Sequence, residues 1–256
     1  MKLEKKTILA ASVTFLFGLA VAFASFQAGD AASVPESTEG SLEFFTDISV
    51  EEVKATEESG EVTIDFDTLQ AKNPDIYAWI TIPGTDIDYP VLQKTDPEDP
   101  YNNYYLNHTV DHTEGLPGAI YSQGVNRKDF KDSVTVLYGH NMKHGGMFTS
   151  LHEFEDKEFF EENSQVIIYT PAGTFTYEIF AAAEFSDDLI PYEYDFSNPS
   201  EVQRYLDDVG GCKGNFRETA KVSKEDNILT LSTCYSGREE NRLLVEAVLV
   251  EEGQAK

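Results

Sequence analysis

Short runs of apolar and β-branched residues, separated by polar turns, follow one another from about Thr63 to the end of the chain. Runs of this length and composition are typical of strands. The pattern predicts strands at 78–82, 133–138, 165–170, 174–185, 228–233 and 243–250, and helices at 67–71, 148–162 and 199–209. Many short strands with few helices favour a closed or nearly closed barrel over alternating strands and helices.

The N-terminus has the pattern of a membrane segment. Three lysines precede an uncharged run, 7–29, whose centre is almost entirely apolar or small. A helix of roughly 20 residues spans the ~30 Å hydrocarbon layer of a bilayer, and flanking lysines stay on the cytoplasmic side. We therefore expect a transmembrane signal-anchor. The alternative is a cleaved signal peptide, because 22–24 (AFA) resembles a cleavage site.

This segment sets the expected domain organisation. Residues 1–6 would be a cytoplasmic tail, 7–29 a single-pass anchor, 30–62 an acidic extracellular stalk and 63–256 the folded domain. The stalk is rich in Ala, Ser, Thr and Glu, and such a segment can bury little apolar surface.

The charge of the chain limits its partners. Acidic residues outnumber basic ones by 46 to 19, a formal net charge of −27. Phosphate backbones and anionic lipids would repel such a chain, so we expect no nucleic-acid partner and membrane contact only through apolar insertion. The charge is typical of solubility, and the alternative is an acidic groove for a cationic partner. Two cysteines are too few for a disulfide framework, although one bridge between them would silence thiol chemistry.

The segment 227–234 (NILTLSTC) is the most informative one for chemistry, because it alternates like a strand with one face on a core. Cys234 ends this strand, and Arg242 opens the next one after a short loop. If the two strands pair as a hairpin, these side chains lie at the same end of neighbouring strands. A guanidinium there would favour a thiolate and could hold a developing oxyanion. The alternatives are an inert buried cysteine and a solvated arginine.

A thiol nucleophile needs a base, and the chain offers five histidines. His140 follows a strand that ends in glycine, which would place its side chain at a strand terminus. His152 lies on a predicted helix, where we expect a surface residue, and His108 and His112 lie in a polar loop. Pairing of His140 with His144, or of His108 with His112, would suit a metal only on a helix, which the glycine-rich sequence disfavours.

Several segments resemble class B sortases. The segment 230–234 (TLSTC) matches the T-L-x-T-C signature of sortases, and 138–142 (YGHNM) resembles the stretch around their catalytic histidine. Further similar segments are 73–91, 104–106, 118–121 and 145–151. The resemblance covers most of the chain from about residue 65 onwards.

The resemblance implies a fold and a site. The fold would be an eight-stranded closed β-barrel with an N-terminal helix and a few peripheral helices, so that 63–256 is a sortase catalytic domain. The site would be Cys234, His140 and Arg242, with Arg238 as a rival for the arginine. By the same resemblance, a substrate groove would be lined by Tyr138, Ser232 and Thr233, each of which also fits ordinary strand packing.

The resemblance also implies a reaction. The Cys234 thiolate would attack a threonyl carbonyl in the C-terminal sorting motif of secreted proteins, His140 would protonate the leaving amine, and Arg242 would steady the oxyanion. The acyl group would then pass to an amine of peptidoglycan or of its lipid-linked precursor. No metal or organic cofactor is required. The enzyme would lie on the membrane of a Gram-positive bacterium, with its catalytic domain outside.

Alternatives remain open at the level of sequence. A pilin-polymerising sortase would use a lysine side chain as acceptor, and a thiol hydrolase would use water. A catalytically silent binding module is a third alternative, although it would have little reason to keep the cysteine, histidine and arginine together. Cys212, in the flexible segment 210–214 (GGCKG), is expected to be a non-essential thiol that is not bridged to Cys234.

Overall fold

The computed structural model describes residues 53–56 and 62–254. These residues belong to one compact unit, Thr38–Lys256, and the other unit, Met1–Ser37, lies outside them. The predicted tail, the predicted anchor at 7–29 and most of the predicted stalk therefore fall outside the described residues. In the part of the chain that is described, no helix has both the length and the apolar composition that crossing a membrane requires.

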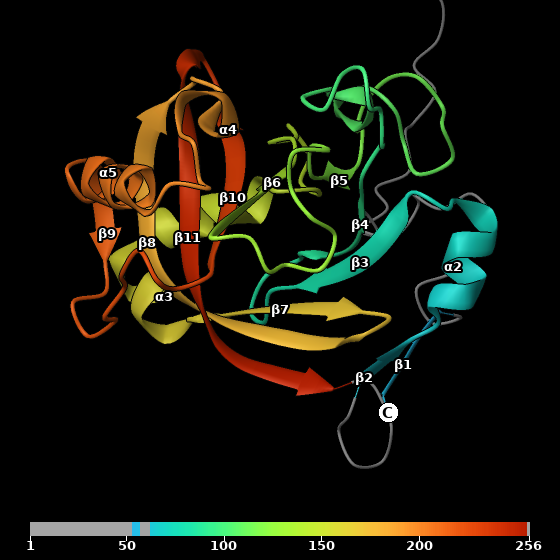
Figure 1. Ribbon diagram of the computed structural model, residues 1–256, viewed down its shortest axis with the longest axis horizontal. Coiled ribbons are helices and arrows are strands. Elements are labelled where there is room, and N and C mark those ends of the chain that lie inside the picture. The colour runs from blue at the N-terminus through green and yellow to red at the C-terminus, as the bar shows by residue number, and fades with distance from the viewer. Residues whose placement is uncertain (1–52, 57–61, 255–256) are drawn as a thin grey trace, which may run out of the picture. The chain divides into compact units, whose positions relative to one another are not determined.

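Eight strands form the closed barrel that the sequence predicts (Figure 1). They are β3 (Ile76–Thr81), β4 (Asp88–Leu92), β5 (Ile120–Tyr121), β6 (Val134–Tyr138), β7 (Gln165–Thr170), β8 (Gly173–Ser186), β10 (Ile228–Tyr235) and β11 (Arg238–Gln254). Hydrogen-bonded neighbours follow the order β11–β10–β6–β5–β4–β3–β7–β8, and a pairing of β8 with β11 closes the ring. The contacts of β10 with β6 and of β4 with β5 are parallel, whereas the other barrel pairs are antiparallel.

Alternation along the strands divides the buried side chains between two clusters. Leu137, Leu231 and Val245 belong to the interior cluster of the barrel. The residues directly before and after these on each strand point to the opposite face of the sheet. There Val136 belongs to a second cluster that packs against α5 (Pro199–Gly210). Both faces of β6, β10 and β11 are therefore buried, which fixes the register of the strands that carry the site.

Short helices and a further strand cover the barrel. The N-terminal helix α2 (Phe66–Lys72) begins at Asp65, whose side chain accepts a hydrogen bond from the Thr68 amide at 3.0 Å. Further elements are η1 (Tyr104–Leu106), α4 (Ile190–Glu193) and β9 (Lys213–Phe216), the last paired to residues 181–184 of β8. Figure 1 shows α5 and β9 on one side of the barrel and α2 on the other.

The prediction of one helix at 148–162 is wrong, because the structure divides this segment. It forms the 3₁₀ helix η2 (Thr149–Glu155) and the α-helix α3 (Lys157–Glu162). Asp156 lies between them in an extended conformation, and its side chain accepts a hydrogen bond from the Phe159 amide at 3.0 Å. An N-cap residue keeps a non-helical backbone, so the cap of α3 ends η2.

One small hairpin precedes the barrel and was not predicted. It pairs β1 (Lys54–Thr56) with β2 (Val62–Ile64). The Lys54 ammonium lies 2.6 Å from an Asp88 carboxylate oxygen, and Val53 is buried. Val53 and Lys54, which belong to the described part of the predicted stalk, thus pack on the folded domain.

Candidate active site

The predicted cysteine and arginine lie on the neighbouring strands β10 and β11, and the predicted histidine follows the end of β6, which pairs with β10 on its other side. In the parallel pairing of β6 with β10, Tyr138 is the partner of Ser232. His140 and Cys234 each come two residues later along the chain, and the Gly139 amide donates to the Ser232 carbonyl at 3.2 Å, so the contact between the two segments extends as far as the residue before His140. Cys234 is in turn the partner of Arg242 in the antiparallel pairing of β10 with β11. The predicted hairpin of Cys234 and Arg242 is therefore confirmed.

The β10–β11 ladder is interrupted immediately after Cys234. Tyr235 pairs with Arg238, whereas Cys234 pairs with Arg242, so residues 239–241 of β11 have no partner on β10. Irregularities of this kind bend a strand and redirect its side chains, and they recur beside active sites. Cys234 is half-buried and its thiol is free. The irregularity thus occurs at the residue that would carry the chemistry.

The His140 ring is oriented by a backbone carbonyl. Its Nε2 lies 2.7 Å from the Leu106 carbonyl oxygen, which only accepts hydrogen bonds. Nε2 must therefore carry the proton, and in the neutral ring Nδ1 is the atom with the lone pair. A base whose second nitrogen is fixed in this way is the usual partner of an activated thiol.

The glycine before this histidine is required by close packing. A Cβ on Gly139 would lie 2.5 Å from Ile120 Cδ1 and 2.7 Å from the Phe148 ring. The Gly139 amide donates to the Ser232 carbonyl at 3.2 Å, which continues the pairing of β6 with β10 up to His140. Gly139 thereby brings His140 close to β10.

The two arginines of the loop have different partners. Arg238 forms an ion pair with Glu184 at 2.9 Å, and its guanidinium lies 3.8 Å from the Tyr235 ring centroid. The Arg242 guanidinium donates to the Glu239 and Asn241 carbonyls at 2.8 and 2.9 Å. Within the described residues Arg242 has no carboxylate partner, so its charge is available to an anion beside Cys234.

The predicted groove residues differ in their exposure. Tyr138 is half-buried and stacks on Tyr121 with ring centroids 5.3 Å apart. Burial raises the pKa of Tyr121, and the negative charge of a Cys234 thiolate raises it further. Ser232 and Thr233 are buried, and the Thr233 hydroxyl donates to the Gly139 carbonyl at 2.8 Å. Tyr138 is thus partly accessible, while the buried Thr233 connects β10 to the residue that follows β6.

The sequence did not predict the contacts that the backbone carbonyl of Cys234 makes. The prediction that His152 is a surface residue is wrong: its side chain is 21% exposed and its Nε2 lies 3.1 Å from the Cys234 carbonyl oxygen. The Asn141 side chain donates to the same oxygen at 3.0 Å. Glu155 lies 2.7 Å from His152 Nδ1. No local pattern marks His152 and Asn141, because their common partner, Cys234, is 82 and 93 residues away in the sequence.

The remaining candidates lie apart from the candidate active site. Cys212 is free, and its thiol donates to the Asp208 carbonyl at 3.3 Å. Burial, together with the negative charge of Asp208, raises the pKa of the Cys212 thiol. The His108 ring stacks on the Tyr104 ring, with the ring centroids 3.8 Å apart. Across the described ranges no three His, Cys, Asp or Glu side chains gather in a way that could hold a metal ion.

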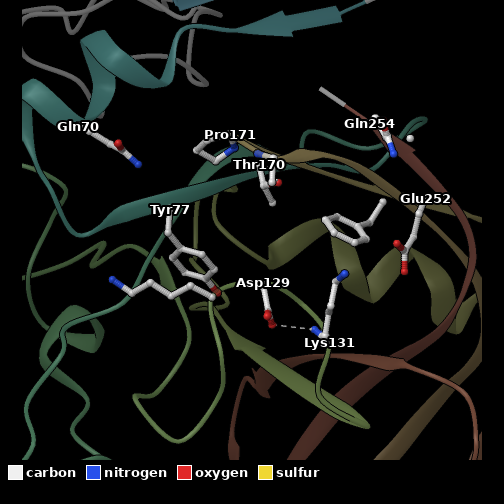
Figure 2. Close-up of a pocket in the computed structure, with 12 residues that line it drawn as sticks. Gln70, Tyr77, Asp129, Lys131, Thr170, Pro171, Glu252 and Gln254 are labelled. Carbon is white, nitrogen blue, oxygen red and sulfur yellow. Dashed lines mark hydrogen bonds between the residues drawn. The ribbon is translucent and has the colours of Figure 1, made fainter. Parts of the chain in front are cut away.

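A cavity of about 630 Å³ lies at another part of the barrel (Figure 2). Its lining includes Gln70, Tyr77, Asp129, Lys131, Thr170, Pro171, Phe175, Glu252 and Gln254. Glu252 lies ten residues beyond Arg242 on β11, a strand length of roughly 33 Å. Because the cavity includes none of Cys234, His140 and Arg242 in its lining, it is separate from the candidate active site.

Comparisons with known proteins show the family of the chain. Residues 80–250 match the family model of the sortase domain. The chain is 33% identical over 205 residues to sortase B of Listeria monocytogenes, covering 79% of this chain and 81% of that protein. The X-ray structure of Clostridium perfringens sortase B has a TM-score of 0.65 at 30% identity and covers 73% of this chain and 100% of that one. A sortase B complexed with triglycine has a TM-score of 0.63 at 28% identity, covering 73% and 85%.

A closed β-barrel that carries a free cysteine opposite an arginine on the neighbouring strand is consistent with the class of cysteine transpeptidases. The matches identify the branch of that class: the chain belongs to the sortase family and, within it, to the class B sortases. Sortases are cell-surface transpeptidases of Gram-positive bacteria that act at the cell wall.

Proposed function

We propose that this sortase cleaves the C-terminal sorting motif of secreted proteins after threonine and transfers the acyl group, through a thioester on Cys234, to a peptidoglycan amine. The observation that carries the proposal is the pairing of Cys234 with Arg242 across β10 and β11, and the pairing of β6 with β10, after which His140 follows, supports the same assignment. The resemblance of the motifs around these residues supports the same roles.

The reaction takes two acyl-transfer steps. The Cys234 thiolate adds to the threonyl carbonyl, and the C–N bond breaks as His140 gives a proton to the leaving amine. An acceptor amine then attacks the thioester, His140 removes its proton, and the C–S bond breaks to restore the thiolate. Splitting one amide exchange into two covalent steps lowers each barrier. The hydrogen bond of His140 Nε2 to Leu106 leaves Nδ1 as the atom for proton transfer.

Arg242 is proposed as the group that faces the developing oxyanion. It is the strand partner of Cys234 and has only carbonyl partners among the described residues, whereas Arg238 is engaged by Glu184 and Tyr235. A charged donor aimed at an oxyanion stabilises the transition state more than the ground state. This difference supports Arg242 over its rival.

The substrate would lie across the strand ends beside Cys234. Tyr138 and its stacking partner Tyr121 would form an aromatic wall of the groove. Ser232 and Thr233 would form its floor through the backbone of β10, because both side chains are buried. Aromatic walls contribute contact area at low entropic cost, which suits an extended peptide.

The acceptor and the location follow from the family and the N-terminal sequence. A class B relative solved with triglycine supports an unhindered primary amine, such as that of a peptidoglycan cross-bridge or its lipid-linked precursor. The apolar run 7–29 would anchor the enzyme in the membrane with its catalytic domain outside.

Product analysis tests the proposal. Purified full-length enzyme is incubated with sorting-motif peptides and with triglycine, Nα-acetyl-lysine amide or no amine. We expect ligation mainly to triglycine, loss of product in Cys234→Ala, and a decrease of about 10²- to 10⁴-fold in His140→Ala. Preferred ligation to lysine would instead indicate a pilin-polymerising enzyme. Cleavage without ligation would indicate a hydrolase, and binding without cleavage a silent module.

A further inference from the structure

Asn141 and η2, which are distant in the sequence, contact the two residues Cys234 and Tyr235. The Cys234 carbonyl accepts from Asn141 Nδ2 at 3.0 Å and lies 3.1 Å from His152 Nε2. The Tyr235 hydroxyl donates to Glu155 at 2.9 Å, and Glu155 also faces His152 at 2.7 Å. Both residues are therefore tied to η2, at the point where the β10–β11 ladder is interrupted.

The hydrogen-bond chemistry of this cluster defines the role of His152. A carbonyl oxygen only accepts, so His152 must donate from Nε2 to bond Cys234. An ionised carboxylate also only accepts, so His152 must donate from Nδ1 to bond Glu155. Both bonds form together only when the ring is an imidazolium. In the neutral ring, with Nδ1 bonded to Glu155, Nε2 would accept from Asn141, which lies 3.0 Å away, and Asn141 alone would hold the Cys234 carbonyl.

The position of the thiol depends on the peptide between Cys234 and Tyr235. The Cys234 sulfur is one bond from Cβ, so a change in its backbone moves the sulfur directly. Displacements of about 1 Å at a reacting atom can lower rates by roughly a hundredfold. A ladder that is interrupted beside Cys234 does not fix the backbone on its own, and the contacts from η2 and Asn141 do so instead.

We propose that His152, oriented by Glu155 and assisted by Asn141, is a positioning residue that fixes the Cys234 backbone and so aims the thiol. This inference rests on the proposed role of Cys234 as nucleophile. His152 does not touch the reacting atoms. It acts through the carbonyl of the nucleophile, and Tyr235 couples the same carboxylate to the next residue of the strand.

The test compares two substitutions of His152 in the full-length enzyme. His152→Leu removes both donors, whereas His152→Gln keeps one amide donor that can reach the Cys234 carbonyl. We expect His152→Leu to lower kcat about tenfold with KM within about twofold, and His152→Gln to restore kcat to within about threefold of wild type. The rate of Cys234 alkylation by iodoacetamide should fall and recover in the same order.

Matched variants keep the test decisive. Asn141→Ser removes the contacts of Asn141 with the Cys234 carbonyl and with His152, and Glu155→Gln removes the carboxylate that faces His152. Neither substitution removes a core side chain, and both should lower kcat more than KM rises. Glu158, an exposed residue of α3, provides the control, and Glu158→Gln should behave as wild type. These variants decide the matter if His152→Leu does not fold.

Two results would overturn the positioning role. One is wild-type kcat and alkylation in His152→Leu, or in both Glu155→Gln and Asn141→Ser. The other is an equal loss in His152→Leu and His152→Gln, because a donor would then not be what matters. Either result with an inactive Cys234→Ala rejects the positioning role alone, whereas turnover by Cys234→Ala rejects the proposed function.

Discussion

A carboxylic acid is buried beneath α5, and its ionisation should make stability depend on pH. Glu246 of β11 is fully buried. One of its oxygens accepts from the Tyr205 hydroxyl at 2.5 Å and the other from the Thr230 hydroxyl at 2.8 Å. Burial raises the pKa of Glu246 from 4.5 to about 7, because the two hydroxyls only partly replace lost hydration. The fold therefore prefers the neutral acid.

The sign and size of the effect follow from this shift. Because the pKa is higher in the folded state, the contribution of Glu246 is fully present below pH 4.5 and is lost as the pH rises through about 7. At about 1.4 kcal/mol for each pH unit in this window, the loss is about 3 kcal/mol. Glu246→Gln keeps one donor and one acceptor for the two hydroxyls but cannot ionise, so it should not show this loss.

Urea unfolding of wild type, Glu246→Gln and Glu251→Gln across pH measures the effect. Glu251 is exposed on the same strand and serves as control. From about pH 5.5 to about pH 8, wild type and Glu251→Gln should each lose about 2 kcal/mol of unfolding free energy relative to Glu246→Gln. A difference in unfolding free energy between Glu246→Gln and wild type that does not change with pH would show that Glu246 does not have a raised pKa in the fold.

Further substitutions test individual residues of the site. Gly139→Ala would place a Cβ 2.7 Å from the Phe148 ring, so thermal unfolding should show about 1–3 kcal/mol of destabilisation and turnover should fall; a wild-type melting temperature would contradict this. Cys212→Ser should keep wild-type turnover of a sorting-motif peptide, and a loss equal to that of Cys234→Ala would contradict the assignment. In the same assay Arg242→Gln should lower kcat/KM about 10²- to 10³-fold and Arg238→Gln less than about tenfold; the reverse order would favour Arg238.

Much of the barrel could be predicted because its longer strands carry their own pattern. The runs that became β3, β6, β7, β8, β10 and β11 are long enough to show β-branched and aromatic enrichment. β4 contains Pro90, which weakens its strand signal, and β5 has only two residues. The division of the 148–162 segment depends on the Asp156 cap, whose effect is easily missed when the apolar spacing on both sides looks helical.

The positions of the candidate site residues could be predicted from local patterns, but their assignment to a site could not. The alternation of β10 and the hairpin indicated that Cys234 pairs with Arg242, and the strand and glycine before His140 indicated a strand terminus. Their selection as a site came from the resemblance to class B sortases. The contact of His140 with Leu106 and those of His152 and Asn141 with the Cys234 carbonyl join segments that only the closed barrel brings together. Local patterns cannot contain that information.

Mass spectrometry of the enzyme after incubation with a sorting-motif peptide in the absence of amine tests directly whether Cys234 carries the acyl group. We expect an added acyl mass that ends in threonine, located on Cys234 by fragmentation and discharged into a ligated product when triglycine is added. An acyl group on Cys212, or no adduct on a folded protein whose Cys234 thiol is free, would contradict this expectation.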